Sequence, residues 1–333
     1  MKMNNLRNAI EPLFMGGFFI LFLNAVEYKY SFMKNDNQLY TQEYVAFLSN
    51  YFCACAKHIP SVFDCSNGST GPIIEQLFSD AIIINGRPDG NFPHHAPDPL
   101  HKGSLVMLQK KVLSERADVG IIFDADGDRA FFIDNKGRFV DPNVIAYLLL
   151  WSLRPKHFIS DVKAGWLIKR HPFESKRIES KTGHYFIKQA MRKWNADFGH
   201  EESGHYYFRD FFYCDSGIFA AIAVLHAIAQ LPYTLAEFVD LLPVTHASGE
   251  INFPISVAKR GTLLQTIENH YKKDAARVSK IDGIAVEFKN PDWWFTVRFS
   301  NTESLARLNV EALDKKVLDK QVRKLTELIK RAK

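Results

Sequence analysis

The stretch Val119-Gly120-Ile121-Ile122-Phe123-Asp124-Ala125-Asp126-Gly127-Asp128-Arg129 decides the fold. Its first five residues form a short apolar run, which predicts a buried strand over Val119–Phe123. In an extended loop, alternate side chains point the same way, so the carboxylates of Asp124, Asp126 and Asp128 can converge on one point. Three carboxylates this close repel one another unless a cation lies among them, and such hard oxygen ligands favour magnesium, calcium or manganese over zinc.

Other interpretations of this acidic run compete with that of a metal loop. An EF-hand calcium loop also begins with alternate aspartates, but it requires glycine at its sixth position and glutamate at its twelfth, where this chain has Arg129 and Asn135. The predicted flanking elements are also strands, whereas an EF-hand has helices. A phosphatase of the haloacid dehalogenase type, which carries an aspartate pair after a strand, stays open, as does a solvated acidic turn.

The chain around this stretch alternates predicted strands with predicted helices, which is typical of a largely parallel sheet covered by helices. We therefore expect two α/β domains, over residues 40–141 and 142–243. The elements expected in the first are a helix around Tyr44–Cys55, strands at Ser61–Asp64 and Ala81–Asn85, and a helix at Leu105–Arg116. Those expected in the second are helices at Val144–Leu153, Tyr185–Trp194 and Gly217–Gln230, with a strand at Phe158–Asp161.

The order of elements changes after Leu242–Pro254, a segment with two prolines and a glycine that is expected to be a linker. A smaller α+β domain with an antiparallel sheet is predicted over residues 250–333. Its expected elements are a helix at Leu263–Tyr271, strands at Ile284–Phe288, Trp293–Phe299 and Ala306–Glu311, and a charged helix at Lys315–Arg331.

Two further segments have the chemistry of a sugar-phosphate site. Arg298-Phe299-Ser300-Asn301-Thr302-Glu303, followed by Arg307, combines guanidinium groups with the hydroxyls of a tight loop, which suits a phosphate group. A second stretch runs from Thr182-Gly183-His184 to Glu201-Glu202-Ser203-Gly204-His205. A glutamate and a serine on a glycine-containing loop can bind the vicinal hydroxyls of a sugar. Each segment alone is also compatible with an ordinary solvated turn.

Composition restricts the class of protein. Hydrophobic residues make up 47% and charged residues 24% of the 333, which is typical of a globular chain. The net charge of +5 is spread along the chain, so no nucleic-acid partner is expected, although it suits an anionic substrate. The four cysteines predict reduced thiols and a cytoplasmic location. The apolar segment Pro12–Val26 is short for a membrane span of roughly 20 residues, and we expect residues 1–39 to pack on the first domain or to reflect where the gene begins.

Taken in order, the three segments resemble the α-D-phosphohexomutase superfamily, which includes the phosphomannomutases and phosphoglucomutases. That family has a D-x-D-x-D-R metal loop in its second domain, a G-E-x-S-G-H sugar loop in its third and an R-x-S-N/G-T-E-P phosphate loop in its fourth. The resemblance covers residues 40–333 and is greatest to the bacterial phosphomannomutases, through the run from His205 to Gly217. It implies two three-layer α/β/α domains followed by a smaller α+β domain.

The resemblance also implies a role for each matching residue. Mg2+ is held by Asp124, Asp126 and Asp128. Catalytic positions are matched by Arg129, Lys163 and His184. The sugar and the non-reacting phosphate of a mannose or glucose 1- or 6-phosphate are bound by Glu201, Ser203, His205, Arg298, Ser300, Asn301, Thr302 and Arg307.

This sequence departs from the family pattern in three places. His200 replaces a glycine and Ser304 replaces a proline, and neither change removes a ligand. The third departure is larger, because the family's first domain carries a phosphocarrier serine in an S-H-N-P-like segment, and no serine-histidine pair occurs in this sequence. The expectation is therefore a mutase lacking its serine domain, which a separate polypeptide or an upstream coding region could supply. A catalytically inactive protein that binds sugar phosphate and magnesium is the alternative, and a phosphatase with an aspartate nucleophile is a third.

Overall fold

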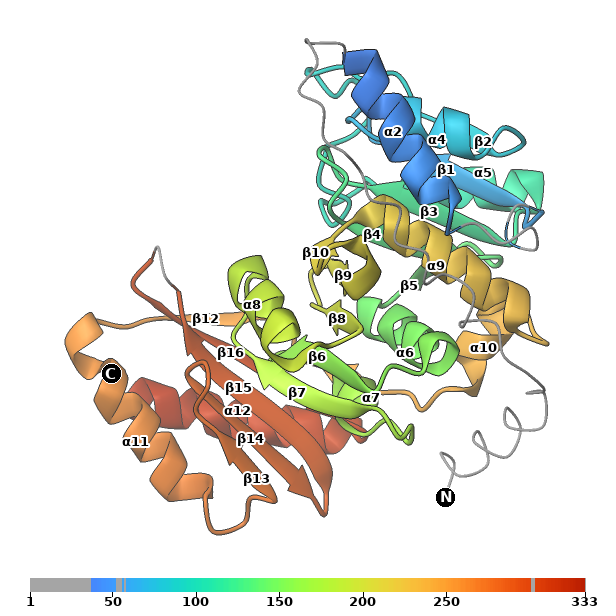
Figure 1. Cartoon of the computed structure of the whole chain (residues 1–333). Helices are drawn as coiled ribbons and strands as arrows, with labels where there is room; N and C mark the ends of the chain where they lie inside the picture. Colours follow the sequence, from blue (N-terminus) through green and yellow to red (C-terminus); the bar gives the residue numbers. More distant parts are fainter. Residues whose placement is uncertain (1–36, 52–55, 57, 301–302, 333) are drawn as a thin grey trace.

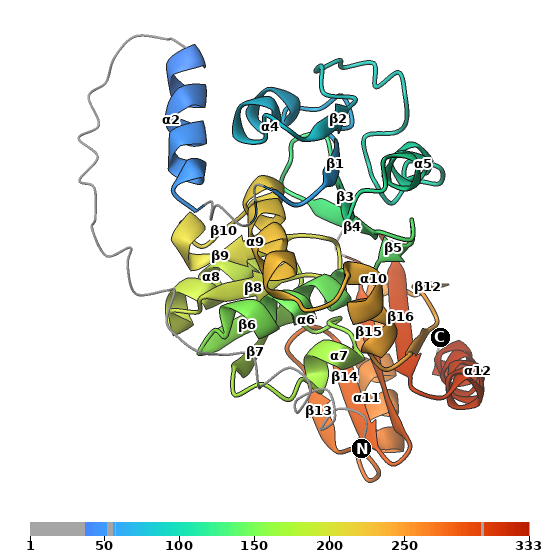
Figure 2. The same cartoon turned by 90° about the vertical axis from the view of Figure 1, so that its right-hand side faces the viewer.

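The computed structural model describes residues 37–51, 56, 58–300 and 303–332. The described chain forms three successive bodies, each built on its own sheet (Figures 1 and 2). The apolar N-terminal segment lies outside the described residues, and so do Asn301 and Thr302 of the phosphate loop. Among the helices that are described, none has the length and apolar character needed to cross a membrane.

The first body contains a mixed five-stranded sheet in the order β2-β1-β3-β4-β5. Its elements are α2 (Asn37–Ser49), β1 (Ser61–Asp64), α4 (Gly71–Leu77), β2 (Ile82–Ile84), α5 (Val106–Glu115), β3 (Val119–Phe123), β4 (Ala130–Asp134) and β5 (Phe139–Val140). Strand β1 pairs in parallel with β2 and β3, whereas β4 runs antiparallel to β3. The sheet is therefore less parallel than expected, because the six residues from Asp124 to Arg129 form a connection too short for a crossover.

Strand β3 explains how the first body joins the second. Its side chains alternate between the two faces of the sheet, as they do in any strand. Ile122 packs with Leu108 and Val112 of α5 on one face, while Ile121 and Phe123 belong to a larger core on the other. That larger core also holds the second body's two most apolar helices. The first two bodies consequently share one continuous hydrophobic core.

The second body repeats the mixed arrangement, with strand order β10-β9-β8-β6-β7. Its elements are α6 (Pro142–Leu153), β6 (His157–Asp161), α7 (Trp166–Lys169), β7 (Lys176–Ser180), α8 (His184–Trp194), β8 (Phe198–His200), β9 (Tyr206–Phe208), η2 (Arg209–Phe211), β10 (Cys214–Asp215), α9 (Gly217–Gln230) and α10 (Leu235–Leu241). Helices α6 and α9 lie between the two sheets (Figure 1), which is why almost all their residues are apolar. Amphipathic α8 covers the other face through Ile187 and Met191.

The third body is an antiparallel sheet in the order β11-β16-β15-β14-β13, with β12 also paired to β16. Its elements are β11 (His246–Ala247), β12 (Ile251–Pro254), η3 (Val257–Lys259), α11 (Arg260–Tyr271), β13 (Arg277–Ser279), β14 (Ile284–Lys289), β15 (Asp292–Phe299), β16 (Leu305–Ala312) and α12 (Lys315–Ala332). The expected linker therefore contributes two strands, since β11 and β12 both hydrogen-bond to β16. Pro254 is tolerated because it ends an edge strand.

The second and third bodies meet through the face of the third sheet that its own helices leave uncovered. On β15, Trp293, Phe295 and Val297 point into the core formed with α11 and α12. Trp294 points the other way, and its Nε1 donates a 2.7 Å hydrogen bond to the buried Glu311. The same carboxylate accepts a 2.7 Å hydrogen bond from the backbone N–H of Trp166 at the start of α7. A buried carboxylate thus joins the two bodies.

Candidate active site

The three aspartates of the acidic run do converge. Asp124, Asp126 and Asp128 each offer a carboxylate oxygen, and these oxygens lie within 4.8 Å of one another. Asp124 is buried, whereas Asp126 is exposed. Burial raises the pKa of Asp124 to about 6, although Arg129 opposes that shift with a hydrogen bond and a positive charge. The donor set consists of hard carboxylate oxygens, so it fits a divalent cation such as Mg2+.

A second loop fixes the shape of the metal loop. Gly127 has a φ of +78°, and a Cβ there would lie 2.4 Å from Cγ2 of Thr70. A Cβ on Gly68 would lie 2.3 Å from the carbonyl oxygen of Ala125, which accepts a 2.9 Å hydrogen bond from the N–H of Ser69. The segment from Gly68 to Thr70 therefore holds the metal loop by close backbone contact, a role that sequence reasoning did not assign to it.

Arg129 connects the metal loop to its surroundings. Its Nε donates a 2.6 Å hydrogen bond to Asp124, and its Nη1 lies 3.3 Å from Asp98. Asp98 lies in the connection between β2 and α5, within the same body. The backbone of Arg129 also forms a β-bridge with His205. This guanidinium therefore lies between the metal loop and the sugar loop.

The sugar loop, residues 201–205, is the turn between β8 and β9, and it packs against the metal loop. Gly204 has a φ of +88°, and a Cβ there would lie 2.6 Å from the ring of Phe131. His205 Nε2 lies 3.5 Å from Asp128, and its Nδ1 lies 2.8 Å from the hydroxyl of Ser203. Burial alone would lower the pKa of His205, but the hydrogen bond and charge of Asp128 raise it above its usual value.

Glu201 is almost fully buried, at 2% exposure. One of its oxygens accepts a 2.6 Å hydrogen bond from the N–H of Gly183, and the other accepts a 2.5 Å bond from the hydroxyl of Tyr207. Both contacts fix the direction of the carboxylate. Sequence reasoning missed Tyr207. This residue comes two positions after His205, so both side chains point to the same face of the strand.

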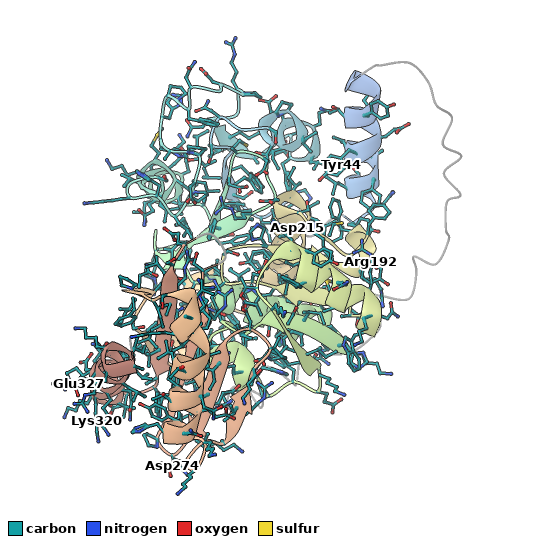
Figure 3. All side chains as sticks on the ribbon, turned by 90° about the vertical axis from the view of Figure 1, so that its left-hand side faces the viewer. Tyr44, Arg192, Asp215, Asp274, Lys320 and Glu327 are labelled. Atoms are coloured by element: carbon teal, nitrogen blue, oxygen red, sulfur yellow. The ribbon has the colours of Figure 1, made fainter. Side chains whose placement is uncertain are left out.

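His184, at the start of α8, lies next to the sugar loop. Its ring centroid is 5.1 Å from that of His205, and its Nδ1 is 3.0 Å from Asp215. Lys188, one helical turn further along α8, forms a 2.6 Å ion pair with the same aspartate. Burial would raise the pKa of Asp215, but the hydrogen bonds from Lys188 and His184 lower it. Asp215, labelled in Figure 3, lies in the run from His205 to Gly217 that carries the resemblance, and sequence reasoning gave it no role.

Lys163 follows β6 and has a different neighbour from the other predicted catalytic residues. Its Nζ lies 3.9 Å from Glu202 of the sugar loop.

His200 stands where the family pattern has a glycine. Its side chain is fully buried, and its Nε2 lies 3.1 Å from Oδ1 of Asn143. Burial lowers the pKa of His200 to about 4, so it is a neutral core residue rather than a charged member of the site.

The phosphate loop connects β15 to β16 in the third body. Arg298 Nε donates a 2.8 Å hydrogen bond to Asp282, and Arg307 Nη2 donates to Ser300 and to Glu303 at 3.4 and 3.1 Å. Arg260, which sequence reasoning missed, donates to the carbonyl oxygens of Ser300 and Glu303 at 3.4 and 3.2 Å. These contacts shape the described part of the loop.

Residues 182–184 connect the phosphate loop to the metal and sugar loops. The N–H of Thr182 donates a 3.2 Å hydrogen bond to Asp282, the partner of Arg298. The next N–H, of Gly183, donates to Glu201, and the next side chain, His184, contacts Asp215. Ligand atoms of His184, Asp215 and Asp128 of the metal loop lie within 4.8 Å of one another, so residues 182–184 lie beside all three predicted motifs.

Comparisons with known proteins agree with this arrangement. Sequence models of the phosphoglucomutase/phosphomannomutase family match residues 42–137 as α/β/α domain II, residues 141–245 as α/β/α domain III and residues 250–328 as the C-terminal domain. The chain is similar to the phosphomannomutase of Salmonella typhimurium, with 37% identity over 75% of this chain and 58% of that protein. It is similar to the phosphomannomutase of Escherichia coli, with 35% identity over 80% of this chain and 62% of that protein.

Another relative and a solved structure extend the match. The phosphomannomutase of Vibrio cholerae is 35% identical over 87% of this chain and 66% of its own length. A solved phosphoglucomutase/phosphomannomutase family protein from Burkholderia thailandensis superposes with a TM-score of 0.77 and 27% identity, over 88% of this chain and 64% of that one. The chain thus spans about three-fifths of the first two curated relatives, and the predicted resemblance is confirmed. This chain belongs to the phosphoglucomutase/phosphomannomutase family, of which it carries domains II, III and IV.

Proposed function

We propose that this chain supplies the metal, sugar and distal phosphate sites of a phosphomannomutase-type enzyme, which interconverts mannose 6-phosphate and mannose 1-phosphate and also takes the glucose pair. The observation that carries the proposal is the link through residues 182–184. It joins a carboxylate cluster suited to a divalent cation to a loop of arginines and hydroxyls suited to a phosphate. Such a substrate is anionic at one end and polyhydroxylated in the middle, which matches that order of groups.

In this proposal Asp124, Asp126 and Asp128 hold Mg2+. When bound, the ion stabilises negative charge on the oxygens of the transferring phosphoryl group. Arg129, already hydrogen-bonded to Asp124, orients a further oxygen of the same group. Arg298, Ser300, Asn301, Thr302 and Arg307 hold the phosphate that does not react.

In this proposal the sugar loop recognises the sugar and takes part in proton transfer. Glu201 accepts hydrogen bonds from the sugar hydroxyls, and the hydroxyl of Ser203 donates to them. His205 transfers the proton: as a sugar oxygen bonds to phosphorus and the bond from phosphorus to the carrier breaks, the hydroxyl proton passes to an imidazole nitrogen. The Nε2 of His205 lies 3.5 Å from Asp128, so this imidazole is beside the carboxylates that would hold the ion. His184 and Lys163, which the resemblance places at catalytic positions, lie next to this ring and next to Glu202, and His184 is the second candidate for the proton transfer.

The phosphoryl carrier is the remaining requirement. No serine followed by histidine occurs in the 333 residues, so in this proposal the carrier serine is contributed from outside them. A separate polypeptide that carries the family's first domain is one such source. Because the proposed substrates are phosphorylated hexoses, we place the reaction in the cytoplasm.

A coupled mutase assay tests this proposal. The purified chain is mixed with mannose 1-phosphate, Mg2+ and a catalytic amount of hexose 1,6-bisphosphate, with and without the isolated first domain of a related phosphomannomutase. We expect turnover only when that domain is added, and its loss in Asp126→Asn and Arg298→Gln. Asp274→Asn, an exposed aspartate on the far side of the third body, is the matched control that retains activity.

Three outcomes would contradict the proposal. Turnover without the added domain would mean that another group of this chain carries the phosphoryl group. Binding of mannose 1-phosphate by calorimetry, without turnover in either mixture, would instead support the inactive binding protein. Release of inorganic phosphate without sugar isomerisation would support the phosphatase.

A further inference from the structure

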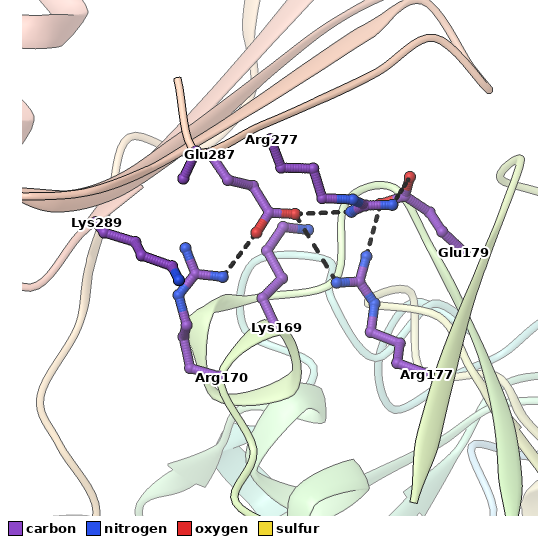
Figure 4. A pocket seen from close by; sticks show the side chains of 8 residues that line it. Lys169, Arg170, Arg177, Glu179, Arg277, Glu287 and Lys289 are labelled. Atoms are coloured by element: carbon purple, nitrogen blue, oxygen red, sulfur yellow. Dashed lines mark hydrogen bonds and ion pairs between the residues drawn. The ribbon is translucent and has the colours of Figure 1, made fainter. Parts of the chain in front are cut away.

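A cavity of about 420 Å³ lies where the second and third bodies meet, away from the three motif loops. The second body contributes Lys169, Arg170 and Arg177, and the third contributes Arg277, Glu287 and Lys289 (Figure 4). Cavities of about 300–1,000 Å³ are the usual size for small-molecule sites. This cavity therefore has room for a metabolite.

The charge of the cavity is unbalanced. Five cationic side chains line it, those of Lys169, Arg170, Arg177, Arg277 and Lys289, against the two carboxylates of Glu179 and Glu287. Both carboxylates are already shared: Arg277 contacts Glu179 at 3.0 Å and Glu287 at 2.8 Å. Even with Asp292, which lies 3.4 Å from Arg170, the cations remain in excess.

Two cations of the cavity have no carboxylate partner in the part of the chain that the structure describes. Lys289 is exposed and lies in no ion pair there. Lys169 donates instead to the carbonyl oxygens of Val162 and Ala164, at 3.0 and 2.6 Å. In addition, the buried Nε of Arg170 lacks a hydrogen-bond acceptor among the described residues. The cavity thus offers donors and positive charge that the protein itself does not use.

The cavity is separate from the phosphate loop. Arg277 pairs with Glu287 across β13 and β14, at the end of these strands remote from the turn that carries Asp282. Asp282, by contrast, contacts Arg298 of the phosphate loop. A ligand of the cavity would therefore not occupy the site proposed above for the substrate.

The lining also restricts the class of ligand. Apart from Ala276, every residue that lines the cavity is charged, so no aromatic ring is available to stack on a base. Three guanidinium groups, which bind phosphate oxygens in pairs, come from both bodies. We propose that this cavity binds a small organic phosphate with two or more anionic groups, which bridges the second and third bodies.

Lys169 provides independent support. Burial, with the nearby charge of Arg177, lowers the pKa of Lys169 to about 7, although Glu287, Glu179 and Asp161 oppose the shift. Its Nζ also lies 3.9 Å from the centre of the Trp294 ring. A bound polyanion would favour the charged amine, so the complex is expected to take up a proton near pH 8. The proposal does not depend on this uptake, but calorimetry in buffers of different ionisation enthalpy would detect it.

Titration calorimetry with inorganic pyrophosphate in EDTA tests the site. The measurements use the Arg298→Gln chain, in which binding of pyrophosphate at the phosphate loop is weakened. We expect one pyrophosphate site, and at least about tenfold weaker binding when Arg277→Gln is added, because a charge-assisted hydrogen bond is lost. Lys289→Gln, which breaks no ion pair, is expected to weaken binding severalfold without affecting folding. Lys320→Gln, an exposed lysine on α12, is the matched control and should bind like its parent.

Three results would overturn the proposal. The first is the absence of pyrophosphate binding in the Arg298→Gln chain. The second is binding that neither Arg277→Gln nor Lys289→Gln weakens. The third is an equal loss in Lys289→Gln and Lys320→Gln, which would reveal attraction to the net charge of the chain. Because the mutase assay depends on Arg298 and this one does not, either proposal can fail without the other.

Discussion

At the scale of single residues, a substitution of Asp126 distinguishes the effect on metal binding from the effect on folding. Its side chain is exposed, whereas Asp124 accepts three hydrogen bonds from the metal loop itself. We expect Asp126→Asn to weaken Mg2+ binding at least about tenfold, since even residues outside the ligand shell change metal affinity by 10–100-fold. The unfolding free energy should stay within about 0.5 kcal/mol of the parent. Calorimetric titration with MgCl2 and urea unfolding measure the two effects, and Asp274→Asn is the control for both.

Glu287 illustrates a carboxylate whose charge stabilises the contact between two bodies. Burial would raise its pKa, but the hydrogen bond from Arg170 and the charges of Lys169, Arg177 and Arg277 lower the pKa from 4.5 to about 2. Between pH 4.5 and about pH 2, the carboxylate of Glu287 therefore binds a proton in the unfolded chain but not in the folded chain. The contribution of Glu287 is therefore fully present above pH 4.5 and is lost as the pH falls towards 2.

Because Glu287 stabilises the folded chain only while it is ionised, removing its charge should have the largest effect near neutral pH. Glu287→Gln should lower the unfolding free energy at pH 7 by about 3 kcal/mol, and the difference from the parent should shrink on going to pH 3. Urea unfolding at both pH values checks this. Glu327→Gln, an exposed glutamate on α12, should change little at either pH. A pH-independent difference would contradict the assignment.

Sequence reasoning predicted which residues of the short motifs lie together, because spacing alone brings them close. The three aspartates converge as alternate positions of a loop, and Arg129 follows them directly. The missed residues, Tyr207, Asp215, Lys188 and Asp282, act through contacts between distant segments. Nothing in the local pattern distinguishes such a residue from a solvated one, so tertiary structure was needed to find it.

At the scale of elements, the start of α9 contacts the backbone of the metal loop and holds it in place. The N–H of Gly217 donates a 2.9 Å hydrogen bond to the carbonyl oxygen of Gly127, and a Cβ on Gly217 would lie 2.5 Å from the carbonyl oxygen of Arg129. Gly217→Ala should therefore destabilise the chain by about 1–3 kcal/mol, because backbone must move. It should also weaken Mg2+ binding, since the displaced backbone carries the ligands.

A second glycine provides the matched control for this change. Gly261 lies in the first turn of α11, and a Cβ there would meet nothing within 4 Å. Gly261→Ala should be neutral or stabilise the chain by up to about 1 kcal/mol, through its better helix propensity. Urea unfolding of both variants compares them. A Gly217→Ala chain as stable as Gly261→Ala would show that the metal loop tolerates displacement.

Element type was predictable from a nearly continuous apolar run in β3 and α9, and from strong helical periodicity in α12. Element direction was harder, because the apolar run of β4 reads the same whether the strand is parallel or antiparallel. The short metal loop decides it, and loop length was the signal available in the sequence. The strands β11 and β12 were missed because each is short and lies among turn residues.

At the scale of the whole molecule, the two largest hydrophobic clusters are separate from each other. The first and second bodies share a single cluster that includes Leu225, whereas Leu325 belongs to a separate cluster in the third body. Both leucines are fully buried. We expect calorimetry to resolve two unfolding transitions, one for the joint core and one for the third body.

Matched substitutions assign the transitions. Leu225→Ala and Leu325→Ala should each cost about 2–5 kcal/mol, and each should lower the midpoint of a different transition. Scanning calorimetry of the two variants and the parent provides the comparison. If both substitutions shift one common transition equally, the contact through Glu311 couples all three bodies into a single cooperative unit.

The contact of Asp282 with Arg298 has a consequence for selectivity. The guanidinium that would meet the distal phosphate already has a counter-ion, fixed in place by the N–H of Thr182. In the proposed function, a phosphate that binds Arg298 would share this guanidinium with Asp282, so its binding is expected to gain less free energy than pairing with an unshielded arginine. We therefore expect inorganic phosphate alone to bind this loop weakly. A hexose phosphate would add hydrogen bonds from its hydroxyl groups, so the resting ion pair would favour the longer ligand.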